Sequence, residues 1–215
     1  MKIYIIHDDR LSARRMNMEK MISDHGFDDV EWITDYKIDD QIIDKVVAMT
    51  KTPMVRGYVS GSLKHYEAMF RIARDNVREA IIFEDDVILS KFWDISKIPR
   101  QFPYVKLGKG TPDMNVKLDD TPISIGNNGG LEAYYVKCMF ARDFIENLDL
   151  GWTIDIEQHA YLFHNNIPLI CVPMCLQEYH TTVHGEKKYS MRWDEYIKDY
   201  YKTSPKFSFR KLKEV

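Results

Sequence analysis

The chain has 215 residues, of which 45% are hydrophobic and 29% are charged, and its formal net charge is −3. These values predict one soluble globular domain over residues 1–215, with a continuous core. They do not fit the basic composition of nucleic-acid-binding proteins, so no nucleic-acid partner is expected. The apolar residues 3–6 are too few for a signal peptide or a spanning helix, which predicts a cytoplasmic protein with at most peripheral membrane contact.

Strand and helix patterns alternate along the first half of the chain. Residues 3–6 form a short apolar run that predicts a strand, and a helical pattern follows it. A second strand is expected at 30–33, again followed by a helical pattern. A further helix is expected over 62–77, leading directly into a strand at 80–83. This alternation predicts an α/β fold with a central, mostly parallel mixed sheet flanked by helices.

The second half of the chain predicts antiparallel additions to this sheet. Strands are expected at 123–125 and 132–136, and the segment between them is rich in Asn and Gly, which favours a hairpin. A helix is expected from about 139 to 148, and another begins near Asp155. A last strand is expected at 169–172. No segment has the composition of a linker between two domains.

Three adjacent carboxylates, Glu84, Asp85 and Asp86, follow the apolar run that predicts the strand at their N-terminal side. Neighbouring carboxylates repel one another unless a cation lies between them, which indicates a divalent metal ion. An exposed acidic turn is the alternative. Ligands of open α/β sheets bind at the carboxyl ends of the strands, and the first strand would bring His7 and Arg10 to the same edge.

The residues before the expected helix at this edge predict an anion site. Gly61 would lie in a loop with free backbone N–H groups, and Lys64 and His65 would lie in the first turn of the helix. Ordinary capping by Ser60 or Ser62 explains the same pattern without a ligand. An anion next to a divalent cation indicates a nucleoside diphosphate, while no Walker A loop and no Gly-x-Gly-x-x-Gly is present.

Four blocks of the chain resemble glycosyltransferase family 25, the lipopolysaccharide and procollagen galactosyltransferase type. The most specific block is Phe83-Glu84-Asp85-Asp86-Val87. The other blocks are residues 3–10 with 14–15, residues 57–66, and residues 130–136 with 152–155. The resemblance implies a GT-A fold, in which about 1–90 forms the nucleotide-binding half and about 91–215 the acceptor half. The chain departs from the family pattern at Tyr58, Lys64 and Thr153.

The resemblance also implies a site with Mn²⁺ or Mg²⁺ as cofactor. Asp86 would hold the metal ion, and His180 would be its second ligand, with a surface-loop histidine as the alternative. A solvated charge is the alternative for Arg10 and for Arg14. The residues expected to bind the nucleotide-sugar are His7, Arg10, Arg14, Gly61, Lys64, His65, Glu84 and Asp85.

The reaction implied is transfer of a sugar from a nucleotide-sugar, expected to be a UDP-sugar, to a glycan or glycolipid acceptor with inversion. Such a transfer needs a carboxylate that takes the proton of the acceptor hydroxyl, and Asp155 is the candidate, with Glu157 in reserve. A capping box of Asp155 and Gln158 would explain Asp155 without chemistry. Retaining transfer, a metal-dependent nucleotide-sugar or phosphoester hydrolase, and an inactive nucleotide- or glycan-binding module stay open as alternatives.

Overall fold

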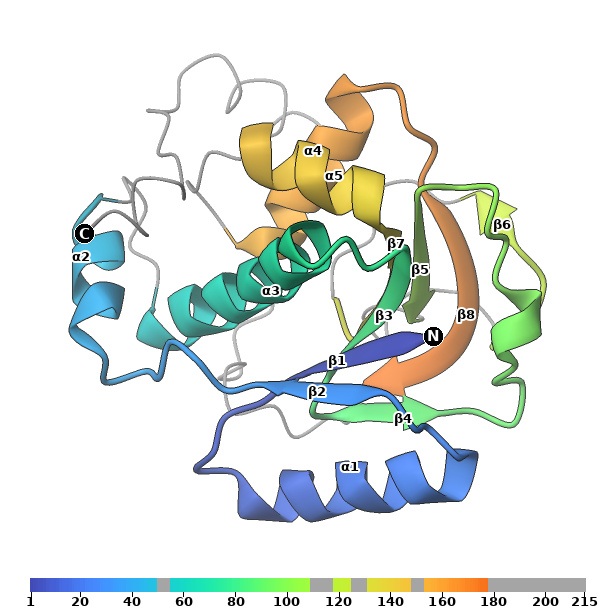
Figure 1. Ribbon diagram of the computed structural model, residues 1–215, viewed down its shortest axis with the longest axis horizontal. Coiled ribbons are helices and arrows are strands. Elements are labelled where there is room, and N and C mark those ends of the chain that lie inside the picture. Colours follow the sequence, from blue (N-terminus) through green and yellow to red (C-terminus); the bar gives the residue numbers. More distant parts are fainter. Residues whose placement is uncertain (50–54, 109–117, 125–130, 148–152, 178–215) are drawn as a thin grey trace.

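Residues 1–49, 55–108, 118–124, 131–147 and 153–177 are described by the computed structural model of the protein (Figure 1). The strands are β1 (Lys2–Ile6), β2 (Val30–Ile33), β3 (Glu79–Glu84), β4 (Val87–Leu89), β5 (Tyr104–Gly108), β6 (Ile123–Ser124), β7 (Ala133–Lys137) and β8 (Ile170–Gln177). The helices are α1 (Ser12–His25), α2 (Gln41–Met49), α3 (Arg56–Arg74), α4 (Cys138–Asn147) and α5 (Ile154–His164), with a 3₁₀ turn at Ile95–Lys97.

In these ranges the eight strands form one mixed sheet in the order β2-β1-β3-β7-β5-β8-β4, with β6 paired to β8. The α/β architecture expected from the sequence is therefore confirmed. Parallel pairing is confined to β2-β1-β3 and to β5-β8, and all other pairs among the described strands are antiparallel. The sheet is therefore mixed, and the expectation that it is mostly parallel is wrong. The hairpin expected between β6 and β7 is wrong, because β7 pairs with β3 and β5 while β6 pairs with β8.

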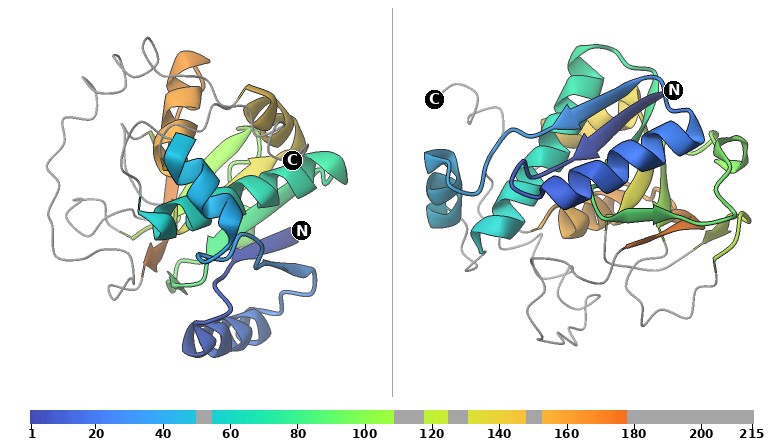
Figure 2. Two further views of the ribbon diagram at one scale, coloured as in Figure 1. Left: turned by 90° about the vertical axis from the view of Figure 1, so that its left-hand side faces the viewer. Right: turned by 90° about the horizontal axis from the view of Figure 1, so that it is seen from below.

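Helices cover both faces of the sheet. Figure 2 shows α3 on one side of β1 and α1 on the other. Alternate residues of the strands serve the two faces, so that Tyr4 and Ile82 pack under α3 while Ile5 and Phe83 pack toward α1. Both faces are thus apolar, which explains why these strands are unbroken apolar runs in the sequence. No helix among the described residues is long and apolar enough to cross a membrane.

Helix α3 begins earlier than the sequence indicates. The expected start was residue 62, whereas the helix begins at Arg56 and includes Gly61 and its neighbours. Val59 and Leu63 are fully buried in the core under α3, so packing of this face extends the helix through its glycines. The prediction that Gly61 lies in a loop before the helix is therefore wrong, and its N–H is not at the helix N-terminus.

Candidate functional site

The carboxyl ends of β1 and β3 lie side by side. Because the two strands are parallel and Ile6 pairs with Glu84, the residues that follow them leave the sheet at the same edge. Asp85 and Asp86 form the turn between β3 and β4, and His7 and Asp8 follow β1. Strand β4, which the sequence did not indicate, turns back after the acidic residues and fixes them in a tight connection.

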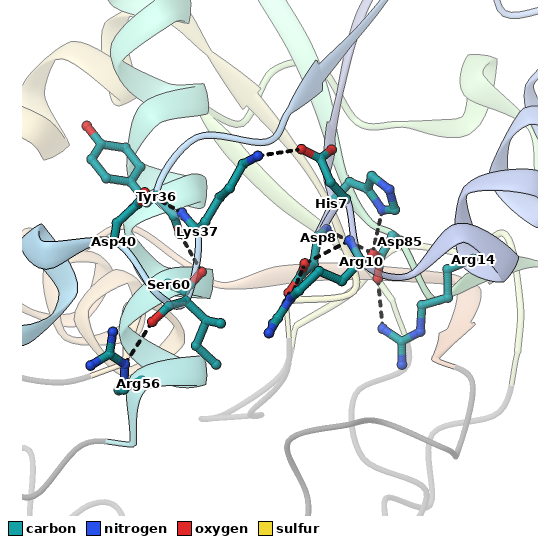
Figure 3. Close-up of polar contacts among 12 residues, drawn as sticks. His7, Asp8, Arg10, Arg14, Tyr36, Lys37, Asp40, Arg56, Ser60 and Asp85 are labelled. Atoms are coloured by element: carbon teal, nitrogen blue, oxygen red, sulfur yellow. Dashed lines mark hydrogen bonds and ion pairs between the residues drawn. The ribbon is translucent and has the colours of Figure 1, made fainter.

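Asp85 is buried between two basic side chains from other elements (Figure 3). His7 Nδ1 lies 2.8 Å from Asp85 Oδ2, and Arg14 of α1 donates to Asp85 Oδ1 at 2.8 Å. The same guanidinium nitrogen lies 3.4 Å from Asp86 Oδ2. His7 packs edge-on against Trp32 of β2, with 5.3 Å between the ring centroids. The acidic turn is therefore tied to β1, β2 and α1.

Asp8 forms a second charged contact at this edge. Arg10 donates from Nε to Asp8 Oδ1 at 2.9 Å, and its guanidinium also contacts the other carboxylate oxygen. Hydrogen bonds from Arg10 are the main reason that the pKa of Asp8 falls to about 2, and the charge of Lys64 lowers it further. Asp8 is thus ionised at any physiological pH, and Arg10 lies beside it rather than on the acidic triplet.

The carboxylate of Glu84 contacts the buried side chain of His65 of α3. His65 is 1% exposed, and its Nε2 lies 3.1 Å from Glu84 Oε1. Its other nitrogen, Nδ1, lies 3.0 Å from the hydroxyl of Tyr134 on β7. Since Glu84 accepts from Nε2–H, Nδ1 is left to accept from the tyrosine hydroxyl. His65 therefore orients a carboxylate of the triplet and lies too deep to be an outer ligand-binding group.

Lys64 is a buried residue of α3 whose charge is influenced by carboxylates at this edge. It is 3% exposed, and desolvation lowers its pKa, although the charges of Asp8, Asp85 and Asp9 oppose this shift. Among the described residues Lys64 makes no hydrogen bond and no ion pair. An ammonium that is largely buried and donates to no acceptor among the described residues is costly, because it has lost part of its hydration without gaining hydrogen bonds.

The start of α5 lies against α3. The backbone N–H of Ile154 donates to Ser62 Oγ at 3.1 Å, so the first turn of α5 is fixed to α3 at Ser62. Thr153 is the N-cap, and its hydroxyl donates to a carboxylate oxygen of Asp155. Asp155 therefore lies inside the first turn, and the capping box expected with Gln158 is wrong. Glu157 is buried in the same turn.

A group of buried polar residues next to α5 was not expected from the sequence. Lys106 of β5 and Glu132 are fully buried, and Glu132 packs so closely on Gly108 that a Cβ there would lie 2.2 Å from its side chain. His159 is buried with them, and burial lowers its pKa to about 4, assisted by the charge of Lys106. In the sequence, this group could have been found from the charged residues Lys106, within the apolar strand β5, and Glu132, directly before β7.

A shallow groove opens beside the acidic turn on the side of α1. Its volume is about 310 Å³, and Asp85 and Asp86 form part of its wall. The other lining residues come from α1 and from β4: Asn17, Met18, Lys20, Met21, Asp24, His25, Val87, Ile88 and Leu89. The two carboxylates are therefore reachable from a surface groove as well as tied to the interior.

The described residues do not by themselves make a metal centre. Both oxygens of Asp85 already face His7 and Arg14, and Arg14 also approaches Asp86. No three His, Cys, Asp or Glu side chains within the described ranges are grouped so as to hold a metal ion. A metal ion at Asp86 would therefore need ligands from elsewhere, and the candidate His180 lies outside the described residues.

Comparisons with known proteins give likenesses among solved structures only at the level of the fold. No protein-family model matches the chain, and no curated protein sequence matches it. Among solved structures, the chain is similar to one described as a glycosyltransferase involved in the glycosylation of the major capsid of PBCV-1. The sequence identity is 10%, the TM-score is 0.46, and the alignment covers 93% of this chain and 100% of that one. A likeness of this degree assigns no activity to the chain.

Proposed function

We propose that the protein is a glycosyltransferase that moves a sugar from a nucleotide-sugar, a UDP-sugar in the first instance, to a glycan or glycolipid acceptor. One observation carries this proposal: the acidic turn at Glu84, Asp85 and Asp86 is contacted by basic side chains, and a second carboxylate, Asp155, lies in the first turn of a helix that is fixed to α3. Described residues of the four blocks that resemble glycosyltransferase family 25 meet at this edge, since His7 contacts Asp85, His65 contacts Glu84, and the N–H of Glu84 donates to the carbonyl of Glu132. This meeting supports the same proposal.

The proposed reaction is an inverting displacement. An oxygen of the acceptor attacks the anomeric carbon of the donor sugar while the bond from that carbon to the phosphate oxygen breaks. The electron pair leaves with the nucleoside diphosphate, and the acceptor hydroxyl passes its proton to Asp155 or, in reserve, to Glu157. In this proposal about 1–90 binds the nucleotide, and about 91–215 supplies the base and the acceptor site.

A ligand panel tests the donor part of the proposal. UDP-, GDP- and CMP-sugars are each added to the protein with Mn²⁺ and, separately, with EDTA, and the melting temperature is followed. A rise with one nucleotide class is expected, because a ligand that binds only the folded state stabilises it. A panel in which no nucleotide-sugar changes the melting temperature under either condition would contradict the proposal.

A nucleotide-sugar hydrolase is the competing activity at the same site. Release of UDP is therefore measured with and without a mixture of glycan acceptors. A transferase releases UDP faster when an acceptor is present and forms a longer glycan, whereas a hydrolase releases UDP at one rate in both conditions. The second outcome would replace the transferase with the hydrolase and would leave the nucleotide site unchanged.

A further inference from the structure

Lys64 is a buried cation whose place in the structure has no structural explanation among the described residues. Its side chain is 3% exposed and makes no hydrogen bond or ion pair with them. Asp8, Asp85 and Asp9 are near enough to favour its charged form. Each of these carboxylates has another basic partner: Arg10 for Asp8, Arg14 for Asp85, and Lys37 for Asp9. Lys64 forms no ion pair with any of them.

Arg14 places a second cation at the same point. It lies 2.8 Å from one oxygen of Asp85 and 3.4 Å from one oxygen of Asp86. A divalent metal ion bound by these oxygens would have to displace the guanidinium and then approach the ammonium of Lys64. The repulsion between like charges in a partly buried site opposes that arrangement. The positions that an acidic motif usually offers to a metal ion are here next to fixed positive charges.

We propose that Lys64 and Arg14 form a resident cation pair that binds the diphosphate of a nucleotide donor, so that donor binding does not require a divalent metal ion. The inference rests on the proposed function and names how the same site recognises its donor. The N–H donors of the Lys64 ammonium bond to no acceptor among the described residues. A phosphate group of the donor supplies acceptor oxygens for them. Asp85 holds Arg14 in place, and the charges of Asp8 and Asp85 favour the charged form of Lys64.

Titration of a nucleoside diphosphate tests the pair. UDP and GDP are titrated calorimetrically into the full chain in excess EDTA and again in Mn²⁺. For the nucleotide that binds, the dissociation constant is expected to agree between the two conditions within about threefold. Lys64→Met is expected to weaken binding in EDTA by at least about tenfold, because one charge-assisted contact to phosphate is lost.

Two further variants separate binding from folding. Lys64→Arg keeps the positive charge and is expected to keep the affinity within a few-fold, whereas Lys37→Met removes an exposed lysine that pairs with Asp9 and should leave the affinity unchanged. Lys64→Met is expected to melt at the same or a higher temperature than the parent, because a buried cation without a partner is replaced by an apolar side chain of similar length. Mn²⁺ should restore part of the lost affinity only in this variant.

Each outcome decides between the inference and its alternatives. Binding that occurs in Mn²⁺ and is absent in EDTA would overturn the cation pair while leaving the proposed function intact. Unchanged affinity in Lys64→Met would overturn it as well, and a lower melting temperature in this variant would identify Lys64 as structural. If neither nucleotide, nor any nucleotide-sugar of the panel, binds in either condition, the proposed function itself fails and the inference fails with it.

Discussion

Asp85 and Glu84 are positioned by residues that the sequence places far from them. Asp85 contacts His7 and Arg14, and Glu84 contacts His65, which in turn contacts Tyr134. The sequence indicated the acidic triplet because its three members are adjacent. It brought His7, Arg14 and His65 to the same site but could not indicate that they contact the carboxylates directly, since these pairings follow from the register of β1 on β3 and from the path of α3. Direct contact of Asp85 with a nucleotide would require Arg14 to move.

The role of Asp155 as a base gives a prediction at the scale of one residue. Asp155→Asn keeps the shape of the side chain and its contact with Thr153 but removes the proton acceptor. We expect transfer to fall by about 100-fold or more, with nucleotide binding retained, as measured by product formation and calorimetry on the same preparation. Glu157→Gln is the comparison, and turnover that persists in Asp155→Asn but is lost in Glu157→Gln would assign the base to Glu157.

Helix α3 shows how an element can depart from its sequence signal. Gly57, Gly61 and the serines near them are typical of a loop, and the sequence was interpreted in that way. The helix forms because Val59, Leu63 and Tyr66 share one buried face, and tertiary packing overrides the weak propensity of single residues. The same helix brings Lys64 and His65 to the acidic turn, so its true start changes the interpretation of the site.

Gly61 provides a test of this element. It lies inside α3, and a Cβ at this position would meet nothing within 4 Å. Gly61→Ala is therefore expected to raise the free energy of unfolding by about 0.5–1 kcal/mol, as measured by urea denaturation. Nucleotide affinity should stay the same, because Gly61 does not lie in an exposed phosphate-binding loop. A clear loss of affinity in a stably folded Gly61→Ala would restore Gly61 to the binding site.

At the scale of the whole molecule, local patterns predicted the elements better than their partners. The strands near the N-terminus and the helices α4 and α5 lie close to where periodicity placed them. The pairing of β6 with β8 did not follow from the sequence, because Asn and Gly between β6 and β7 indicate a turn but not which strands the turn connects. The buried Lys106 and Glu132 were missed for a similar reason, since their neighbours come from distant segments.

The buried His159 makes stability depend on pH. Its pKa is lowered from about 6.5 to about 4 by burial and by Lys106, so the unfolded chain binds a proton in this range that the folded chain does not. The free energy of unfolding is therefore expected to fall as the pH drops from about 6.5 to about 4, by at most about 3 kcal/mol. Denaturation at several pH values measures the slope.

Two substitutions test whether His159 causes this pH dependence of the free energy of unfolding. His159→Gln removes the titrating group and is expected to flatten the pH dependence in this range, whatever its effect on stability at neutral pH. His25→Gln, at the exposed end of α1, is the matched control and should keep the slope of the parent. An unchanged slope in His159→Gln would assign the acid sensitivity to other groups.

The central position of β7 has a consequence for how the chain folds. This strand separates β3 from β5 and pairs with both, yet it can form only after residues 133–137 have been synthesised. Until then the apolar strand β3, with Ile81 and Phe83, has an unpaired edge that other chains can extend. About the first ninety residues are therefore not expected to fold as a separate unit. Chaperones are expected to bind a nascent chain of that length, because the edge of β3 is still unpaired.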